Sequence, residues 1–442
     1  MIVDVREDER VQRYLSEVCE QVRASEVHRD IRWELESHLQ DLVDAKLEKD
    51  CSFNQAVEES LSELGDPEQI GRGLHKVHKP KMEWGLLAIV VMFLGMALFA
   101  IFAVETSMSS MRGMAQLLFE HELIFVSLGF MVLIGFYFMD YRKMERWAWG
   151  IMALPFVLAL LVHIVGEQVN GQKVLHIKNM VIDVPLISIC CFVIGSAALY
   201  TRKHTSNGSI WTRLALFVVY PSILFISLHS FSSMIVYMTA FVSIQLVMGT
   251  LRKEVFGALF IWIFLGLCYL LRQPYILARM TVFLRPTENS QDMNYMAVQS
   301  MMSIRSAGWW GHGFGIVNKS LPEIHTEMLF TYLIYAHGWM AGILIVLSSL
   351  LLVSRLIRTG SCVRDPFGRA IILGFTAVIA VQFIWTFAMS VGWLPITGFQ
   401  MPFLSYGGSH LVLTCACMGC ILSVYRKKDR ISRLAGMNIR RS

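Results

Sequence analysis

The chain has 442 residues, of which 55 % are hydrophobic and 17 % are charged, and its formal net charge is +5. Soluble globular domains hold about 25 % charged residues, so this composition excludes that class. We expect a polytopic membrane protein with no nucleic-acid partner. The segment from Met1 to Arg10 is charged and lacks an apolar core, so we expect no cleavable signal peptide.

Residues 1–80 differ from the rest of the chain because they combine many charged residues with apolar residues at helical spacing. This pattern predicts a small cytoplasmic domain of three or four short helices. An apolar face on one of these helices needs a packing partner. The residues of that predicted face are Ile31, Leu35, Leu39, Leu42 and Leu47.

Two places in this prefix carry the signals of helix ends. Ser52 stands three residues before Gln55, which is the spacing of a capping box. Gly65, Asp66 and Pro67 follow the order of a C-terminal cap, an N-cap and a first-turn proline. The prefix resembles the permease-prefix type of domain that precedes membrane segments in some Gram-positive bacterial proteins. It is either a passive helical cap or a module that docks a partner.

Ten mostly apolar stretches follow the prefix, each near the length of about 20 residues that carries a helix across a bilayer. Since helices satisfy every backbone polar group inside the membrane, the sequence predicts an all-α membrane domain over residues 81–428. A basic cytoplasmic tail is predicted over residues 429–442. The predicted spans are Trp84 to Val104, Glu122 to Met139, Trp147 to Val165, Val184 to Tyr200, Leu214 to His229, Met234 to Gly249, Val255 to Leu271, Met328 to Ser354, Arg369 to Gly392 and His410 to Tyr425.

Lys and Arg residues are concentrated in alternate loops between these spans. Because positive charge is retained on the cytoplasmic side of a membrane, we expect these loops and both chain termini to be cytoplasmic. The chain is then a multi-pass protein of the plasma membrane. The residues concerned are Arg142, Lys143, Arg146, Arg202, Lys203, Arg213, Arg252, Lys253, Arg355, Arg358, Arg364, Arg426, Lys427, Lys428 and Arg430.

The nine cysteines lie in predicted spans or in inner segments. With none in an outer loop, the sequence indicates no disulfide framework. Cys415, Cys417 and Cys420 lack a common zinc-binding spacing, so we interpret them as small packing residues rather than ligands of a soft metal.

The stretch SLPEIHTEMLF, from Ser320 to Phe330, places three ionisable side chains before a long apolar run. A carboxylate at a membrane boundary usually has a raised pKa, a partner or a function. On a helix starting here, Glu323 and Glu327 would share a face, and with His325 they could supply a general base or hold a divalent cation. The alternative is that these acids only solvate the interface and cap the helix.

The stretch GFQMPFLSYGGSHL, from Gly398 to Leu411, lies between two apolar runs. Its proline and glycines predict backbone that is not regular helix, with free amides beside several hydroxyl groups. Such backbone at membrane depth lines protein or a watered cavity, and amide donors suit anions such as phosphates. The candidate binding residues are Ser405, Tyr406, Gly407, Gly408 and Ser409.

Three motifs occur in order along the second half of the chain. They are RPTENSQDMNYMAVQSMMSIRSAGWWGHGFG from Arg285, LPEIHTEMLF from Leu321 and PITGFQMPFLSYGGS from Pro395. With the ten predicted spans, these motifs make residues 84–428 similar to the SEDS family of shape, elongation, division and sporulation proteins, of the FtsW, RodA and SpoVE type. GWWGHGFG, from Gly308, is expected to be a tight turn and not a nucleotide-binding loop.

This resemblance implies cell-wall synthesis by glycosyl transfer. Members of the family polymerise lipid II with release of undecaprenyl pyrophosphate, and they act with a class B penicillin-binding protein. Glu327 stands where the family has an Asp, so it is the implied general base, with His325 and Glu323 orienting it or joining a divalent cation, Mg or Mn. Arg305 and Lys319 are candidates for binding the pyrophosphate, or else are ordinary loop cations.

Some family patterns are absent from the chain. NGQKVLHI, from Asn170, replaces the family's NGA-RW pattern, and the QPSE pattern is replaced around Ile182 to Leu186. Two other functions therefore stay open. One is a catalytically inactive SEDS paralogue that acts as a scaffold for the cell-wall machinery. The other is a flippase for lipid-linked precursors, although the sequence shows no inverted repeat.

Overall fold

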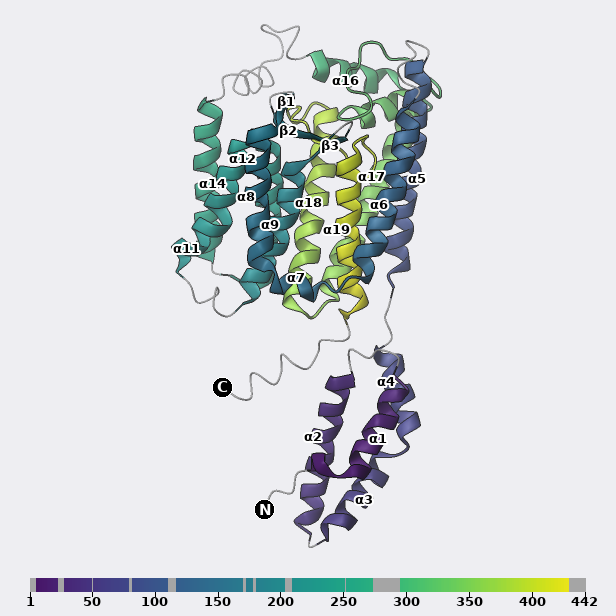
Figure 1. The fold of residues 1–442 in the computed structure, drawn as a ribbon. Coiled ribbons are helices and arrows are strands. Elements are labelled where there is room, and N and C mark those ends of the chain that lie inside the picture. Colours follow the sequence, from purple (N-terminus) through teal and green to yellow (C-terminus); the bar gives the residue numbers. More distant parts are fainter. Residues whose placement is uncertain are drawn as a thin grey trace. The chain divides into compact units, whose positions relative to one another are not determined.

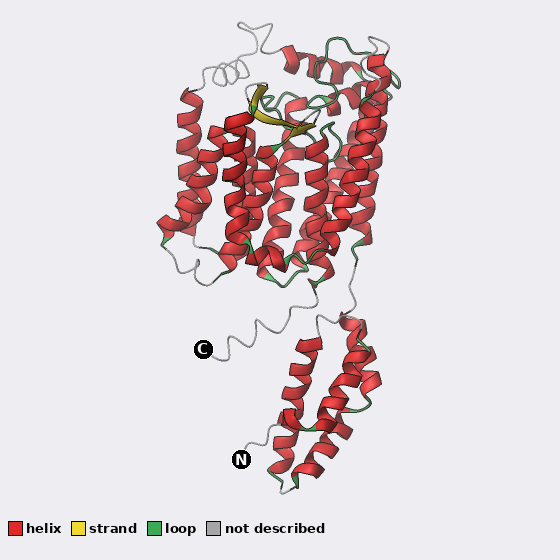
Figure 2. Cartoon of the chain, in the orientation of Figure 1, coloured by secondary structure: helices red, strands yellow, loops and turns green. Residues whose placement is uncertain are grey.

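The computed structural model of the chain consists mainly of helices (Figures 1 and 2). The chain divides into two compact units, one of Met1–Met82 with Arg426–Ser442 and one of Glu83–Tyr425. The structure describes residues 5–22, 28–49, 51–78, 82–109, 117–169, 172–177, 180–202, 209–250, 252–272 and 295–428.

The described residues of the first unit form four α-helices after a short 3-10 turn, as the spacing of the apolar residues predicts. α1 packs against α4, and α2 packs against α3. Each helix buries one apolar face, which is the main source of stability for helices this short. The elements are η1 (Val5–Glu7), α1 (Glu9–Glu20), α2 (His28–Leu47), α3 (Phe53–Leu64) and α4 (Pro67–His78).

The predicted apolar face of α2 is correct in part. Ile31 and Leu39 are buried in the core of this unit, whereas Leu42 is only half-buried and Val43 takes the neighbouring core position. The helical repeat explains the difference. Residues four apart lie on the same face of a helix, so Val43 follows Leu39 into the core, while Leu42 lies beside that face.

The predicted helix ends of the prefix are confirmed at both α3 and α4, and only the capping box at Ser52 is wrong. Asp66 Oδ2 accepts a hydrogen bond from the N–H of Gln69 at 3.2 Å, and Pro67 is the first residue of α4. Gly65 ends α3 with a φ of 95°. Ser52 is the N-cap of α3, but its side chain makes no capping hydrogen bond, so the predicted capping box is not formed.

In the described part of the second unit, ten helical stretches are long and apolar enough to cross a membrane, as predicted. The fifth is built from three consecutive segments, of which the middle one, η3, is π-helical. The stretches are α5 (Trp84–Ser109), α6 (Leu118–Phe138), α8 (Ala148–Val165), α9 (Val184–Thr201), α11 (Ile210–Leu214) with η3 (Ala215–Val219) and α12 (Tyr220–Ser227), α13 (Phe231–Met248), α14 (Arg252–Arg272), α17 (Leu329–Ser361), α18 (Pro366–Ser390) and α19 (Gly408–Arg426).

α9, α18 and α19 form the centre of the helical bundle, because most of their residues are buried. α13 packs against both α18 and α9, whereas α14 lies at the edge of the bundle beside α11 and α13 (Figure 1). An ion pair between Arg213 of α11 and Glu254 of α14 holds this edge together. Both charged groups are almost fully buried, so each neutralises the other where water is scarce.

α17 is broken at Gly338, which has a φ of 82°. The carbonyl oxygens of Tyr335 and Ala336, next to the break, accept hydrogen bonds from the backbone N–H groups of His312 and Gly313 at 3.0 and 2.9 Å. The predicted turn after Gly308 is thus confirmed and fills the break. The break itself was not predicted, because the apolar run continues through it.

Three short strands connect α8 to α9 and were not predicted. β1 (Glu167–Val169), β2 (Gln172–Ile177) and β3 (Met180–Ile182) pair antiparallel in that order. They lie at the same end of the bundle as α16 (Tyr295–Ser306), and we call this the loop end (Figure 1). The short helix α7 (Arg142–Arg146) lies at the opposite end.

Candidate functional site

Two non-helical segments meet at the loop end. The acidic segment comprises residues 320–328 and leads into α17. The glycine segment comprises residues 398–409, of which 398–407 are non-helical and Gly408 and Ser409 begin α19. They lie far apart in the sequence, but the backbone and side chains of one bond directly to the other. Together they hold most of the side chains selected from the sequence.

The acidic segment is a turn and not the start of a helix, because α17 begins only at Leu329. The backbone of Glu323 has a φ of 49°, and its carbonyl oxygen accepts hydrogen bonds from the N–H groups of Thr326 and Met328 at 3.2 and 3.1 Å. The expected helical face shared by Glu323 and Glu327 is therefore wrong. The first turn of α17 holds no acidic residue, so the helix-capping alternative is wrong as well.

The ionisable side chains of this segment differ in exposure. Glu323 is exposed, and its Oε2 accepts a hydrogen bond from Thr326 Oγ1 at 2.9 Å, while His325 and Glu327 are half-buried. Burial lowers the pKa of the His325 imidazole, and the nearby Glu323 carboxylate opposes that shift. His325 Nδ1 is buried without a hydrogen-bond partner among the described residues. A neutral imidazole therefore stands two residues from Glu327.

The glycine segment is non-helical up to Gly408, as predicted. Phe403, with a φ of 66°, is fully buried, and its ring stacks on that of Phe93 in α5 with a centroid distance of 5.9 Å. Ser405 Oγ accepts a hydrogen bond from the N–H of Met401 at 2.9 Å. The segment is thus fixed by packing and by its own hydrogen bonds.

Two hydrogen bonds join the segments. The N–H of Tyr406 donates to the carbonyl oxygen of His325 at 2.9 Å, and Ser405 Oγ donates to the carbonyl oxygen of Thr326, also at 2.9 Å. The rings of His325 and Tyr406 meet edge to face, with a centroid distance of 5.8 Å. The backbone on the N-terminal side of Glu327 is therefore held by the glycine segment.

Gly407 and Gly408 allow neighbouring side chains to pack directly against the backbone of the glycine segment. A Cβ at Gly408 would overlap the ring of Phe125 in α6, and a Cβ at Gly407 would lie 2.9 Å from Gln400 Oε1. Amide donors aimed at a phosphate were expected here. That role stays a prediction, and the structure adds that the Phe125 ring of α6 lies directly against Gly408.

Sequence reasoning missed Asp183, the N-cap of α9. Its Oδ1 accepts a hydrogen bond from the N–H of Leu186 at 2.9 Å, and its own N–H donates to Ser409 Oγ at 3.2 Å. Burial raises the pKa of this carboxyl group, although the bond from Leu186 opposes the shift. An Asp two residues before a proline at the start of an apolar run is an N-cap signal that could have identified it.

Sequence reasoning also missed Glu122 of α6, which was taken only as the edge of a span. It is fully buried, and neither carboxylate oxygen has a hydrogen-bond partner among the described residues. It shares a helical face with Phe125, which packs on Gly408. Burial raises the pKa of the Tyr406 phenol, and the Glu122 carboxylate raises it further.

The proposed phosphate-binding cations lie on neighbouring elements. Arg305 is exposed in the last turn of α16, and Lys319 is exposed in the turn that precedes the acidic segment. Asn318 Nδ2 donates to Ser303 Oγ at 2.9 Å, which attaches this turn to α16. In the described residues neither cation forms an ion pair. Both are free to meet an anion at the loop end.

A divalent cation would have few protein ligands at this site. Among the described residues, no three His, Cys, Asp or Glu side chains gather in a way that could hold a metal ion. Mg²⁺ needs fewer, because it is often bound by one or two carboxylates together with the phosphates of a substrate. The acidic segment supplies two carboxylates, those of the exposed Glu323 and the half-buried Glu327.

The loop end therefore carries a half-buried carboxylate, Glu327, in the same turn as the half-buried His325, and the exposed cations Arg305 and Lys319 on neighbouring elements. In its described residues the chain is thus a helical membrane protein with ten candidate spans and a polar site at one end of the bundle. The family description "Cell cycle protein", of the FtsW, RodA and SpoVE type, matches residues 84–430. The chain belongs to this family, and the membership predicted from the motifs is confirmed.

Similar proteins cover most of the membrane unit. Stage V sporulation protein E of Bacillus subtilis is 28 % identical over 318 residues, which cover 70 % of this chain and 86 % of that protein. The "Probable peptidoglycan glycosyltransferase FtsW" of Alkalilimnicola ehrlichii is 26 % identical over 378 residues, or 81 % of this chain and 92 % of that protein. A protein of the same name from Geobacter sp. is 33 % identical, but the match spans only 44 % of its length.

Solved structures confirm the fold. One chain, reported under "Structural coordination of polymerization and crosslinking by a peptidoglycan synthase complex", matches 78 % of this chain and 98 % of its own length, with a TM-score of 0.66 and 20 % identity. The rod shape determining protein RodA of Thermus thermophilus matches 78 % of this chain and 97 % of its own length, with a TM-score of 0.59 and 17 % identity.

Proposed function

We propose that the protein polymerises lipid II at the outer face of the plasma membrane. One observation carries the proposal: two hydrogen bonds connect the segments next to Glu327. The Tyr406 N–H and the Ser405 hydroxyl donate to the carbonyl oxygens of His325 and Thr326, the two residues immediately before Glu327. The names of its relatives, which include peptidoglycan glycosyltransferases and a sporulation protein, support cell-wall synthesis in division or sporulation.

In the proposed reaction, Glu327 takes the proton from the 4-hydroxyl group of one lipid-linked disaccharide. That oxygen forms a bond to the anomeric carbon of the other substrate, and the bond from this carbon to the pyrophosphate oxygen breaks. Undecaprenyl pyrophosphate leaves with the electron pair. Arg305 and Lys319 stabilise the departing negative charge, and a divalent cation bound to the pyrophosphate and to Glu323 would add to this stabilisation.

The proposed orientation places the loop end outside the cell. The helices α7 and α11, whose sequences contain Arg142, Lys143, Arg146 and Arg213, lie at the end of the bundle opposite the strands and α16 (Figure 1). Positive charge is retained on the cytoplasmic side, so this distribution supports cytoplasmic termini and an outer site. The proposed partner is a class B penicillin-binding protein, which would crosslink the polymer.

Polymerisation of purified lipid II by the detergent-solubilised protein, with and without candidate class B partners, tests the proposal. Glu327→Gln should reduce the rate by at least about 100-fold, because it removes the general base, while thermal stability stays unchanged. Glu327→Asp keeps the carboxylate but moves its oxygens by about 1 Å, so an intermediate rate is expected. Equal polymer from the Gln variant would rule out Glu327 as the base.

A scaffold function without catalysis is the second candidate. It is favoured by the prefix, which has its own buried core of Val11, Leu15, Leu39, Val43 and Val57. Deletion of residues 1–80 should then abolish recruitment of partner proteins in cells, and the purified protein should make no polymer with or without these residues. Unchanged recruitment would count against this candidate.

A further inference from the structure

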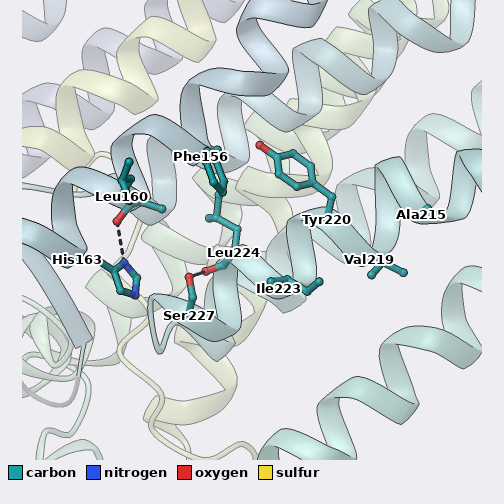
Figure 3. A pocket seen from close by; sticks show the side chains of 10 residues that line it. Phe156, Leu160, His163, Ala215, Val219, Tyr220, Ile223, Leu224 and Ser227 are labelled. Atoms are coloured by element: carbon teal, nitrogen blue, oxygen red, sulfur yellow. Dashed lines mark hydrogen bonds between the residues drawn. The ribbon is translucent and has the colours of Figure 1, made fainter.

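A groove of about 390 Å³ lies between α8 and the fifth span, and none of its lining residues belongs to the two segments of the site (Figure 3). Its walls come from α8 on one side and from η3 and α12 on the other. This volume is within the range of small-molecule sites, about 300–1,000 Å³. The groove is lined by Phe156, Ala159, Leu160, His163, Ala215, Val219, Tyr220, Ile223, Leu224 and Ser227.

Irregular helix geometry coincides with the groove. Pro155 lies inside α8, and the π-helical turn η3 with Pro221 after it interrupts the regular spacing of the fifth span. Prolines and π-helical turns displace side chains from the positions they would take on a regular helix. The side chains of the two helices therefore do not interdigitate fully here, and a space is left between them. The hydrogen bond from Tyr220 Oη to the carbonyl oxygen of Met152, at 3.0 Å, ties the two helices together beside the cavity.

The groove has an apolar length and one polar end. Ala159 and Leu224 are buried, while Leu160 and Ile223 are more than half exposed, so the groove opens toward the surroundings of the bundle, which are lipid. His163 and Ser227 stand together at one end (Figure 3). Nδ1 of His163 is bonded to the carbonyl oxygen of Ala159 at 2.8 Å and therefore carries the proton, which leaves Nε2 as an acceptor.

The polar end lies on the same side of the bundle as the candidate site. His163 is in the last turn of α8, and β1 begins four residues later. The strands lead to Asp183, whose N–H bonds to Ser409 of the glycine segment. A lipid with its chain in the groove would thus have its polar head at the membrane surface, on the face that carries the acidic segment.

We propose that this groove binds the polyisoprenoid chain of a lipid-linked substrate or product, an assignment that rests on the proposed function. A single apolar chain suits walls made from only two spans, whereas a phospholipid brings two chains. A partner helix is about 10–12 Å across and would pack over the rims without filling the groove. Holding the chain in the groove positions the pyrophosphate at the loop end.

Photo-crosslinking in vesicles tests the groove without requiring turnover. The full-length protein carries p-benzoylphenylalanine in place of Ile223 on the rim, or in place of Leu246, an exposed residue of α13, as the control. The vesicles are phosphatidylglycerol with a small fraction of radiolabelled undecaprenyl phosphate. Capture of label from position 223 should exceed that from position 246 about tenfold. Equal capture, or capture of phosphatidylglycerol alone at position 223, would overturn the proposal.

A blocking variant sharpens the test. Ala215 lines the groove and is exposed, so Ala215→Phe should fill it without disturbing the core and should reduce capture at position 223 to the control level. Ala153→Phe places the same ring on an exposed position of α8 outside the groove and should leave capture unchanged. Retained capture with Ala215→Phe would overturn the groove assignment. Enriched capture by a protein that makes no polymer would instead refute the proposed function alone.

Discussion

The acidic segment and the glycine segment are both non-helical, yet they are built in different ways. The acidic segment keeps Glu323 exposed and Glu327 half-buried, and it is fixed through its backbone. The glycine segment buries Phe403 and Ser405 and is fixed through its side chains. One segment presents the reactive groups and the other holds them in place. Changes to the carboxylates of the first should therefore reduce activity alone, and changes in the second should reduce stability as well.

Gly408→Ala should show the largest effect of this kind on stability. The added Cβ overlaps the Phe125 ring, and such overpacking costs typically about 1–3 kcal/mol. Thermal unfolding in detergent measures the loss, and Phe125→Leu in the same chain should restore much of it. Gly135→Ala in α6, where the Cβ meets open space, is the control and should not destabilise. A stable Gly408→Ala protein would contradict the close packing.

Glu122→Leu should stabilise the protein. A buried polar group without a hydrogen bond costs about 1–3 kcal/mol, and leucine removes that cost at similar volume. The same measurement on Glu120→Leu, an exposed acid of the same helix, should show little change. If the melting temperature of Glu122→Leu rises while its polymerisation rate falls, Glu122 of α6 also contributes to function. A fall in stability would mean that Glu122 has a partner in the folded protein.

Ser405→Ala should cost less, about 1–2 kcal/mol, because it leaves the carbonyl oxygen of Thr326 and the N–H of Met401 without their bonds to Ser405 Oγ. Activity should fall together with stability, since the bond to Thr326 fixes the segment that carries Glu327. Ser354→Ala, at an exposed position of α17, is the matched control. Loss of activity without loss of stability would give Ser405 a direct part in the reaction.

The pH dependence due to His325 should be the smallest effect. Burial lowers the pKa of His325, so the unfolded chain binds this proton more readily than the folded protein. The stability that comes from the neutral imidazole is present above about pH 6.5 and is lost as the pH falls through the lowered pKa of the folded state. The melting temperature of the parent should therefore drop more than that of His325→Gln as the medium is acidified. Parallel curves would refute this.

Hydropathy predicted the ten spans well, because burial in lipid requires long apolar runs at every crossing. It could not predict the break in α17, since Gly338 lies inside such a run. The contribution of Glu122 was hidden for a related reason. A single acid near the end of a span has the pattern of a boundary, and only the packing of α6 on the glycine segment shows that it is enclosed.

The candidate site was predicted in composition but not in geometry. The sequence identified Glu327, His325 and the glycine segment, yet it suggested a helix at Glu323 where the chain forms a turn with a φ of 49°. The local preference for a helix at Glu323 was outweighed by the hydrogen bonds between the two segments. Those bonds join residues far apart in the sequence, so the spacing of residues along the chain cannot predict them. Asp183 was overlooked because the three strands that bring it to Ser409 are short and irregular.

The crossing of the loop after Gly308 with the break in α17 limits how this protein can evolve. A Cβ at Gly311 would overlap the carbonyl group of Ala336, and one at Gly338 would overlap the carbonyl group of Trp309. At Gly408 the obstacle is the side chain of Phe125, so a second mutation can make room. At Gly311 and Gly338 the obstacle is backbone, which no substitution shortens. A substitution at Gly408 can therefore be compensated by a second substitution at Phe125, whereas no second substitution can compensate a change at Gly311 or Gly338.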